Sequence, residues 1–173
     1  MQNVLEFWFE TLSPSDWYKK SDDLDRRIRT QFEPTLKTIL AGETSDWRDS
    51  ADGRLAEIIV LDQFTRNMYR GKPASFATDP LALALAQEAV RCGDDQDLDP
   101  DKRAFLYMPY MHSESPKVHE KALELFADLP NLEYEKRHKA IIDRFGRYPH
   151  RNEILGRTST AEEIEWMATN KGF

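Results

Sequence analysis

The stretch EKALELFADLPN, residues 120–131, closely resembles the end of a tetratricopeptide repeat, in which a small-residue helix is followed by a turn. A second stretch, LALALAQEAVRCG at residues 81–93, has the same pattern of small and aliphatic residues at helical spacing. Amphipathic helices of alanine and leucine are common in proteins. The two stretches therefore favour stacked helical hairpins, but they do not establish them on their own.

Helical periodicity continues on both sides of these stretches, and no segment has the alternation typical of a strand. Pro34 predicts a kink or a break in its helix, and Ser159 with Glu162 forms a capping box that predicts the start of the last one. The longer predicted helices cover residues 22–41, 53–69, 75–92, 99–113, 116–128 and 132–145. With short helices added, we expect one all-α domain over residues 1–173, a tetratricopeptide-like α-α superhelix of about seven to nine helices.

Composition narrows the class of protein. Of the 173 residues, 40% are hydrophobic, which is enough for a core, and the net charge of -7 argues against a general affinity for nucleic acid. The single cysteine, Cys92, excludes an internal disulfide, fits a reducing compartment and is expected to be half-buried near a helix end. The N-terminus lacks a positive signal-peptide region, and no apolar run is long enough to span a membrane. We expect a cytoplasmic protein that binds neither membrane nor nucleic acid.

The predicted helix 53–69 changes character along its length. Its first half, LAEIIVLDQF, is apolar nearly all round, which indicates central burial. Its second half carries a polar stripe at spacings of three and four residues, formed by Gln63, Arg66, Asn67 and Arg70. This stripe either faces a ligand or pairs with internal carboxylates such as Asp62, Asp79 or Glu114, since arginine suits both.

The stretch RFGRYPHRNEILGR, residues 144–157, is locally basic in an acidic chain. The sequence predicts that one helix ends before Gly146 and that another begins at Pro149. The free backbone N–H groups at this new start would lie beside Arg147 and Arg151, with Arg144 and Asn152 close in sequence. An anionic ligand fits such a place. A glutamate from a neighbouring helix fits it equally well.

Three histidines fall near these polar segments: His112, His138 and His150. With Glu114 they would make a metal site only if the fold brought them together, and there is no spacing that demands one, so no metal is predicted. We place His119 on an exposed helix face. Phosphate-binding loops and nucleophile elbows are absent from the sequence, so no cofactor is predicted.

Several motifs together resemble a bacterial family of uncharacterised proteins, the domain of unknown function numbered 924. They are LDQFTRNMYRGKPASFATDPLALALA, YMPYMHSES and RHKAIIDRFGRYPHRNEILGRTSTAEE, and the opening VLEFWF and WYKKSDDLDRRIRTQF also match. The resemblance implies an all-helical, tetratricopeptide-like superhelix and no established activity. The resemblance also implies that a set of polar residues recurs in the family. They are Asp62, Gln63, Arg66, Asn67, Arg70, Asp79, His112, Glu114, His138, Arg144, Arg147, His150, Arg151 and Asn152.

Three functions follow from these observations. The first is a binding module whose groove, formed by Gln63, Arg66, Asn67 and Arg70 with the residues of the basic stretch, holds an anionic small molecule or an acidic peptide or protein segment. The second is a small hydrolase or lyase with His112 or His150 as the base and Arg66 or Arg147 as the anion stabiliser. The third is a scaffold whose polar network is structural. The sequence leaves open whether the chain is an enzyme. The complete set of ligand-binding candidates is Gln63, Arg66, Asn67, Arg70, Glu114, His138, Arg144, Arg147, His150, Arg151 and Asn152.

Overall fold

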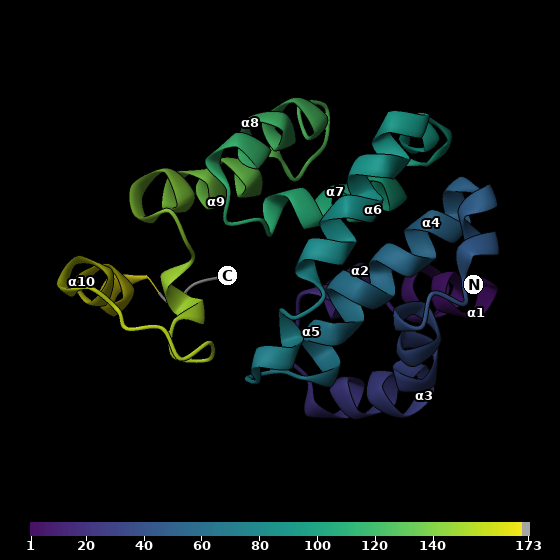
Figure 1. Ribbon diagram of the computed structural model, residues 1–173, viewed down its shortest axis with the longest axis horizontal. Coiled ribbons are helices and arrows are strands. Elements are labelled where there is room, and N and C mark those ends of the chain that lie inside the picture. The colour runs from purple at the N-terminus through teal and green to yellow at the C-terminus, as the bar shows by residue number, and fades with distance from the viewer. Residues whose placement is uncertain (171–173) are drawn as a thin grey trace.

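The computed structural model describes residues 1–170, and every regular element in this range is a helix (Figure 1). Capping and turn residues explain most of the helix boundaries. Asp99 accepts a hydrogen bond at the start of one helix, and Gly93 and Gly146 end two others with positive φ angles. The α-helical segments are α1 (Gln2–Leu5), α2 (Pro14–Trp17), α3 (Asp22–Leu40), α4 (Ala51–Ile58), α5 (Thr65–Met68), α6 (Asp79–Cys92), α7 (Pro100–Met111), α8 (Pro116–Leu125), α9 (Leu132–Phe145) and α10 (Ala161–Thr169).

Helices α4 and α5 belong to one continuous rod, because the π-helical segment Ile59–Phe64 joins them without a break. The described residues therefore hold nine helices, which confirms the predicted all-α class and helix number. Consecutive helices from α6 to α9 pack each against the next, and α4 packs against both α6 and α7. This stacking of neighbours in sequence is the arrangement of tetratricopeptide-like proteins. None of these helices has both the length and the apolar character needed to cross a membrane.

Of the kink or break predicted at Pro34, the break does not occur. Helix α3 continues through Pro34, because its buried face, with Phe32 and Leu36, holds it together although one backbone hydrogen bond is lost. Two other local predictions were wrong. The capping box lies one residue later than predicted, at Thr160 and Glu163. Cys92 is exposed rather than half-buried.

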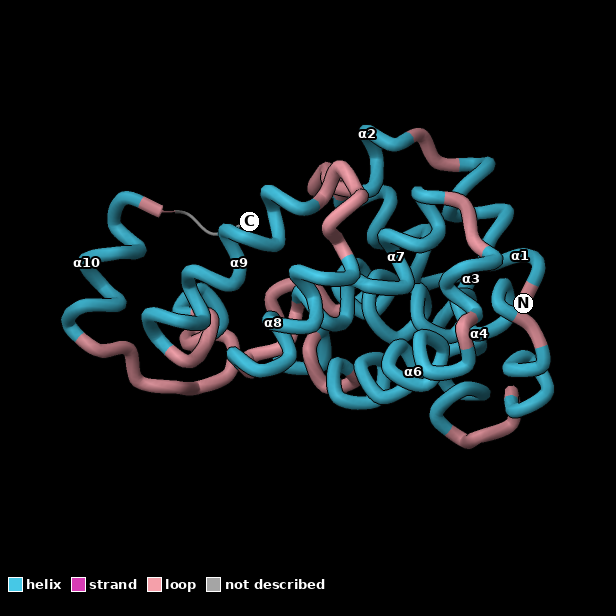
Figure 2. Tube along the Cα trace, turned by 90° about the horizontal axis from the view of Figure 1, so that it is seen from above, coloured by secondary structure: helices cyan, strands magenta, loops and turns pink. Residues whose placement is uncertain are grey.

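Most apolar side chains form one core, whose members extend from Val4 to Leu129 along the chain. Its centre is aromatic: the ring of Trp8 contacts Phe64 and Phe105 edge-to-face, with both centroids 5.5 Å away. A smaller apolar cluster, Ile141, Ile142 and Tyr148 with Phe145 and Trp166, lies at the C-terminal end. The view from above shows α10 and the N-terminus at opposite ends of the long axis (Figure 2).

The start of α4 packs closely against the short 3₁₀ helix Ser45–Asp49. Glu57, fully buried on α4, accepts hydrogen bonds from Thr44 and Arg48 and ties the two segments together. At Gly53 the backbone of Trp47 lies where a side chain would be, since a Cβ atom at this position would overlap the carbonyl oxygen of Trp47. Glycine is therefore required at this position.

Candidate functional site

The π-helical segment Ile59–Phe64 sets the position of the site. An i→i+5 turn widens the helix, and such turns are rare and frequent at functional sites. Asp62 lies within it, fully buried, and its carboxylate faces α6 and α7. The periodicity of the sequence predicted an uninterrupted α-helix here, because one extra residue in a turn leaves no signal in an apolar run.

A cleft of about 410 Å³ opens beside this segment. One wall comes from the N-terminal loop with Lys19, another from the end of α7 and from α9, and a third from the turn after α9. It gathers eight of the side chains singled out in the sequence. They are Gln63, Arg66, Asn67, Arg70, His112, His138, His150 and Arg151.

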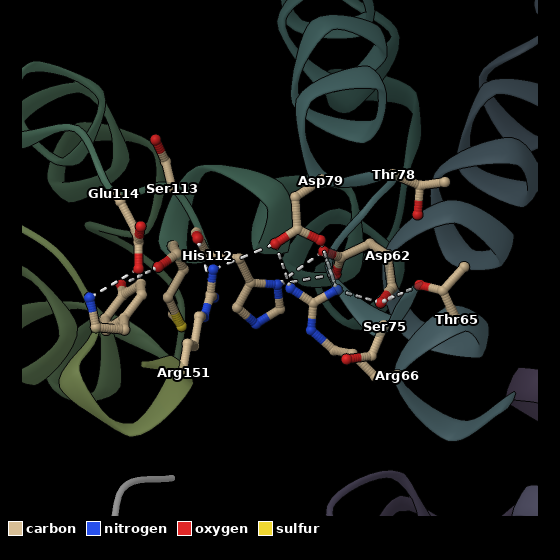
Figure 3. Close-up of polar contacts among 12 residues, drawn as sticks. Asp62, Thr65, Arg66, Ser75, Thr78, Asp79, His112, Ser113, Glu114 and Arg151 are labelled. Atoms are coloured by element: carbon tan, nitrogen blue, oxygen red, sulfur yellow. Dashed lines mark hydrogen bonds and ion pairs between the residues drawn. The ribbon is translucent and has the colours of Figure 1, made fainter. Parts of the chain in front are cut away.

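A chain of alternating charges runs along one side of the cleft (Figure 3). Arg66 binds the Asp62 carboxylate at 3.0 Å and forms a fork with both oxygens of Asp79, at 3.1 and 3.0 Å. Arg151 extends the chain by donating to Asp79 at 3.3 Å and to the carbonyl oxygen of His112 at 3.1 Å. Two arginines thus meet two aspartates, so the ion pairs within the chain balance.

Burial and neighbouring charges shift the pKa values of both aspartates. Burial opposes ionisation of Asp62, but Arg66 and His112 outweigh it and hold the pKa of Asp62 below its ordinary value. Burial raises the pKa of Asp79 above its ordinary value, although Arg66 works in the other direction. Asp79 therefore takes up a proton more readily than Asp62 as the pH falls.

His112 is fixed in one tautomer. Its Nδ1 lies 2.8 and 3.0 Å from the two oxygens of Asp62, and an ionised carboxylate only accepts hydrogen bonds, so Nδ1 carries the proton. Burial, and then the charge of Arg66, lowers the pKa of His112 below its ordinary value. In a neutral ring with Nδ1 protonated, Nε2 holds a lone pair, and the ring lines the cleft.

The other two histidines of the cleft are also neutral near pH 7. Burial lowers the pKa of His138 to about 3 and that of His150 to about 4. Nδ1 of His138 donates to the carbonyl oxygen of Tyr134 at 2.7 Å. Nδ1 of His150 is buried without a hydrogen-bond partner in the described residues. The three imidazoles thus line the cleft without adding positive charge.

Arg151 is held between two aromatic rings. Its guanidinium carbon lies 4.7 Å from the ring centroid of Phe76 and 4.5 Å from that of Tyr148. The side chain is only 8% exposed, and its Nε has no hydrogen-bond partner among the described residues. Burial, followed by repulsion from Arg66, lowers the pKa of Arg151 from its ordinary value. A buried arginine with an unused donor is expected to gain from a further acceptor.

Four of the predicted site residues lie outside the cleft and pair internally: Arg144, Arg147, Asn152 and Glu114. Arg144 binds Glu162, and Arg147 forms a two-point contact with Glu163, to which Asn152 also donates. The predicted meeting of Arg144 and Arg147 with the polar stripe is therefore wrong. Both side chains point toward α10, which provides the carboxylates.

Glu114 occupies the place where the sequence allowed an anionic ligand. It accepts a hydrogen bond from the backbone N–H of Tyr148 at 2.8 Å and a two-point contact from Arg157 at 2.6 and 3.0 Å. The internal glutamate of the two alternatives is thus present after α9. Glu114 does not line the cleft, and among residues 1–170 no His, Cys, Asp and Glu side chains group as metal ligands would.

His119 is fully buried, not exposed as predicted. Its Nδ1 lies 2.7 Å from buried Glu135 on α9, and its Nε2 lies 3.2 Å from the hydroxyl of Tyr148. That hydroxyl donates to the carbonyl oxygen of Met111. The contacts fix Tyr148 as the rigid wall against which Arg151 stacks.

Replacing Tyr148 with phenylalanine should lower the free energy of unfolding by about 1 kcal/mol, because it removes a buried hydrogen bond and retains the ring. Urea unfolding measures this. Tyr134→Phe is the matched control, since Tyr134 is 56% exposed and should tolerate the change without loss. Equal stability of the two variants would show that the Tyr148 hydroxyl does not hold the wall.

The sequence did not single out several residues that line the cleft. Among them are Trp17, Lys19 and Phe76. Phe76 follows the turn at Gly71 and Pro73, and nothing in that segment indicates which face it covers. Only contacts across the fold place these residues here.

Comparison with known proteins agrees with the fold. The family model described as "Bacterial protein of unknown function (DUF924)" matches residues 4–171. A solved structure of a protein of unknown function from Agrobacterium tumefaciens is 35% identical in sequence, with a TM-score of 0.93. The match covers 99% of this chain and 97% of the other. No curated protein matches the sequence.

Proposed function

The chain belongs to the bacterial DUF924 family, and since that membership assigns no activity, we propose a function from the cleft itself: it binds a small molecule that carries a carboxylate group. The observation that carries the proposal is the convergence of three neutral imidazoles and three arginines, Arg66, Arg70 and Arg151, on one open cleft. Asp62 and Asp79 pair with Arg66 and Arg151, and Asp25 pairs with Arg70. Nε2 of His112 has no hydrogen-bond partner among the described residues, so it is left for a ligand.

Size and charge define the ligand class. About 410 Å³ is within the range of small-molecule sites, which is roughly 300–1,000 Å³. Arg66 and Arg151 are matched by Asp62 and Asp79, so a dianionic phosphate beside them would face the repulsion of both aspartates. A carboxylate brings a single charge and accepts charge-assisted hydrogen bonds from arginine. Phe76 lines the cleft and is partly exposed, so its ring provides apolar surface for the rest of the ligand.

Direct binding tests this proposal. Native mass spectrometry of the purified protein, compared with its denatured mass, first shows whether a ligand is carried. Calorimetric titration with acetate, succinate and glutarate, and with inorganic phosphate for comparison, then gives the affinities. We expect a dicarboxylate to bind more tightly than phosphate.

The variant Arg151→Gln should weaken dicarboxylate binding at least about tenfold, because a charge-assisted hydrogen bond contributes about 1.5–3 kcal/mol. Arg144→Gln is the matched control: it removes the same charge from an exposed pair outside the cleft and should leave the affinity unchanged. Equal weakening in both variants would mean that net charge, not the cleft, governs binding. Tighter binding of phosphate would contradict the carboxylate class.

A further inference from the structure

We propose that the cleft hydrolyses an ester of a carboxylate-bearing molecule, with His112 as the general base that activates water. The inference rests on the proposed function, because the carboxylate would hold the substrate in the cleft. Asp62 orients the His112 ring through Nδ1, at 2.8 Å, and Nε2 has no hydrogen-bond partner among the described residues. An acid–histidine pair of this kind fixes the tautomer that a general base needs.

The cleft makes water the nucleophile. Apart from tyrosines, Ser75 is the residue of the described cleft lining that carries a hydroxyl group. Its side chain is buried, with the residue 3% exposed, and the hydroxyl donates to the carbonyl oxygen of Lys72. The hydroxyl of Tyr148 is also used, by the carbonyl oxygen of Met111. With the hydroxyls of Ser75 and Tyr148 engaged in this way, the lone pair of His112 acts on a bound water.

The step balances with one water molecule. Nε2 of His112 accepts a proton from water while the water oxygen bonds to the ester carbonyl carbon, and the C=O electron pair moves to the oxygen. When this intermediate collapses, the bond to the alcohol oxygen breaks. His112 then returns its proton to that oxygen, so the products are a carboxylic acid and an alcohol. Arg66 and Arg151 provide N–H donors and positive charge near the developing oxyanion.

The basicity of His112 favours ester hydrolysis over elimination. Its pKa is lowered by burial, so it is unprotonated at neutral pH but is a weak base. Water that adds to an activated carbonyl needs only a weak base in the transition state, whereas removal of a proton from carbon demands a stronger one. The same lowered pKa predicts a pH–rate profile that rises to a plateau below the ordinary titration range of histidine.

The probe is p-nitrophenyl hydrogen glutarate, an ester with a free carboxylate, compared with neutral p-nitrophenyl butyrate. We expect saturable hydrolysis of the glutarate ester, with a higher kcat/KM than for the butyrate ester. His112→Gln should lower kcat about 100-fold or more with little change in KM. Arg151→Gln should mainly raise KM. Arg144→Gln, outside the cleft, should behave like the unaltered protein.

The outcomes separate the two proposals. Glutarate binding without hydrolysis of its ester would overturn the general base and leave the binding function intact. If the protein neither binds glutarate nor hydrolyses its ester, both the binding function and the general base are wrong. Hydrolysis that survives His112→Gln in a folded variant would exclude His112 as the base. If that variant does not fold, ¹⁵N NMR of the unaltered protein decides: a His112 ring protonated on Nε2 instead of Nδ1 would contradict the mechanism.

Discussion

Replacing Arg66 with alanine is expected to lower the free energy of unfolding by about 3–5 kcal/mol at pH 7, because it leaves buried charge without compensation. Arg66 lies between Asp62, which is fully buried, and Asp79, and it binds both. Without it, Asp62 keeps only His112 and Gln63 as donors, and Asp79 keeps Arg151. The two carboxylates then repel each other across the cleft wall.

This loss should shrink as the pH falls from 7 to 5. Burial and Asp62 already raise the pKa of Asp79, and removal of the Arg66 charge raises it further. A carboxyl group whose pKa is higher in the folded than in the unfolded state binds more protons when folded. The free energy of unfolding therefore increases as the pH falls toward the pKa of the unfolded state. It decreases again as the pH rises through the pKa of the folded state.

Urea unfolding at pH 7 and pH 5 measures both effects. The double variant Arg66→Ala/Asp79→Asn should regain part of the lost stability at pH 7, since it removes one of the two opposed charges. Arg144→Ala breaks an exposed pair and should cause no measurable change. A small effect of Arg66→Ala that does not depend on pH would show that the charge chain adds little to stability.

Replacing Gly53 with alanine should destabilise the fold by about 3 kcal/mol or more, at the upper end of the cost of overpacking. The new Cβ would overlap the carbonyl oxygen of Trp47 and lie 2.9 Å from Sδ of Met1. The carbonyl is backbone, and Glu57 ties its segment to α4, so relief requires the 3₁₀ helix to move.

Thermal and urea unfolding compare this variant with Gly93→Ala. Gly93 has a φ of +83° and open space around it, so alanine there costs only conformational strain, about 1–2 kcal/mol. If Gly53→Ala were the milder of the two, the close approach of the Trp47 segment to α4 would be wrong. The comparison separates a packing clash from backbone strain.

The helices could be predicted from the sequence because their causes are local. Apolar spacing, caps such as Asp99 and terminal glycines such as Gly93 act within a few residues, and the predicted class and helix number are confirmed. Pro34 shows the limit of local reasoning. A helix with its face buried in the core continues through a residue that disfavours it, and only the tertiary packing reveals this.

Only part of the candidate site could be predicted from the sequence. The stripe of Gln63, Arg66 and Asn67 was visible because helical spacing places such residues on one face, and these residues line the cleft. For the basic stretch, composition showed a charge excess without showing its partners. Glu162 and Glu163 follow later in the chain, and the fold alone decides that Arg144 and Arg147 meet them while Arg151 turns into the cleft.

The cleft walls come from opposite ends of the chain, Trp17 to Lys19 on one side and His138 to Ile154 on the other. During synthesis the ribosome releases the N-terminal helices and their aromatic core first. The cleft is complete only when residues 138–154 have also emerged. A nascent or truncated chain that ends before α9 would therefore lack one wall of the cleft, however much of the core it had already packed.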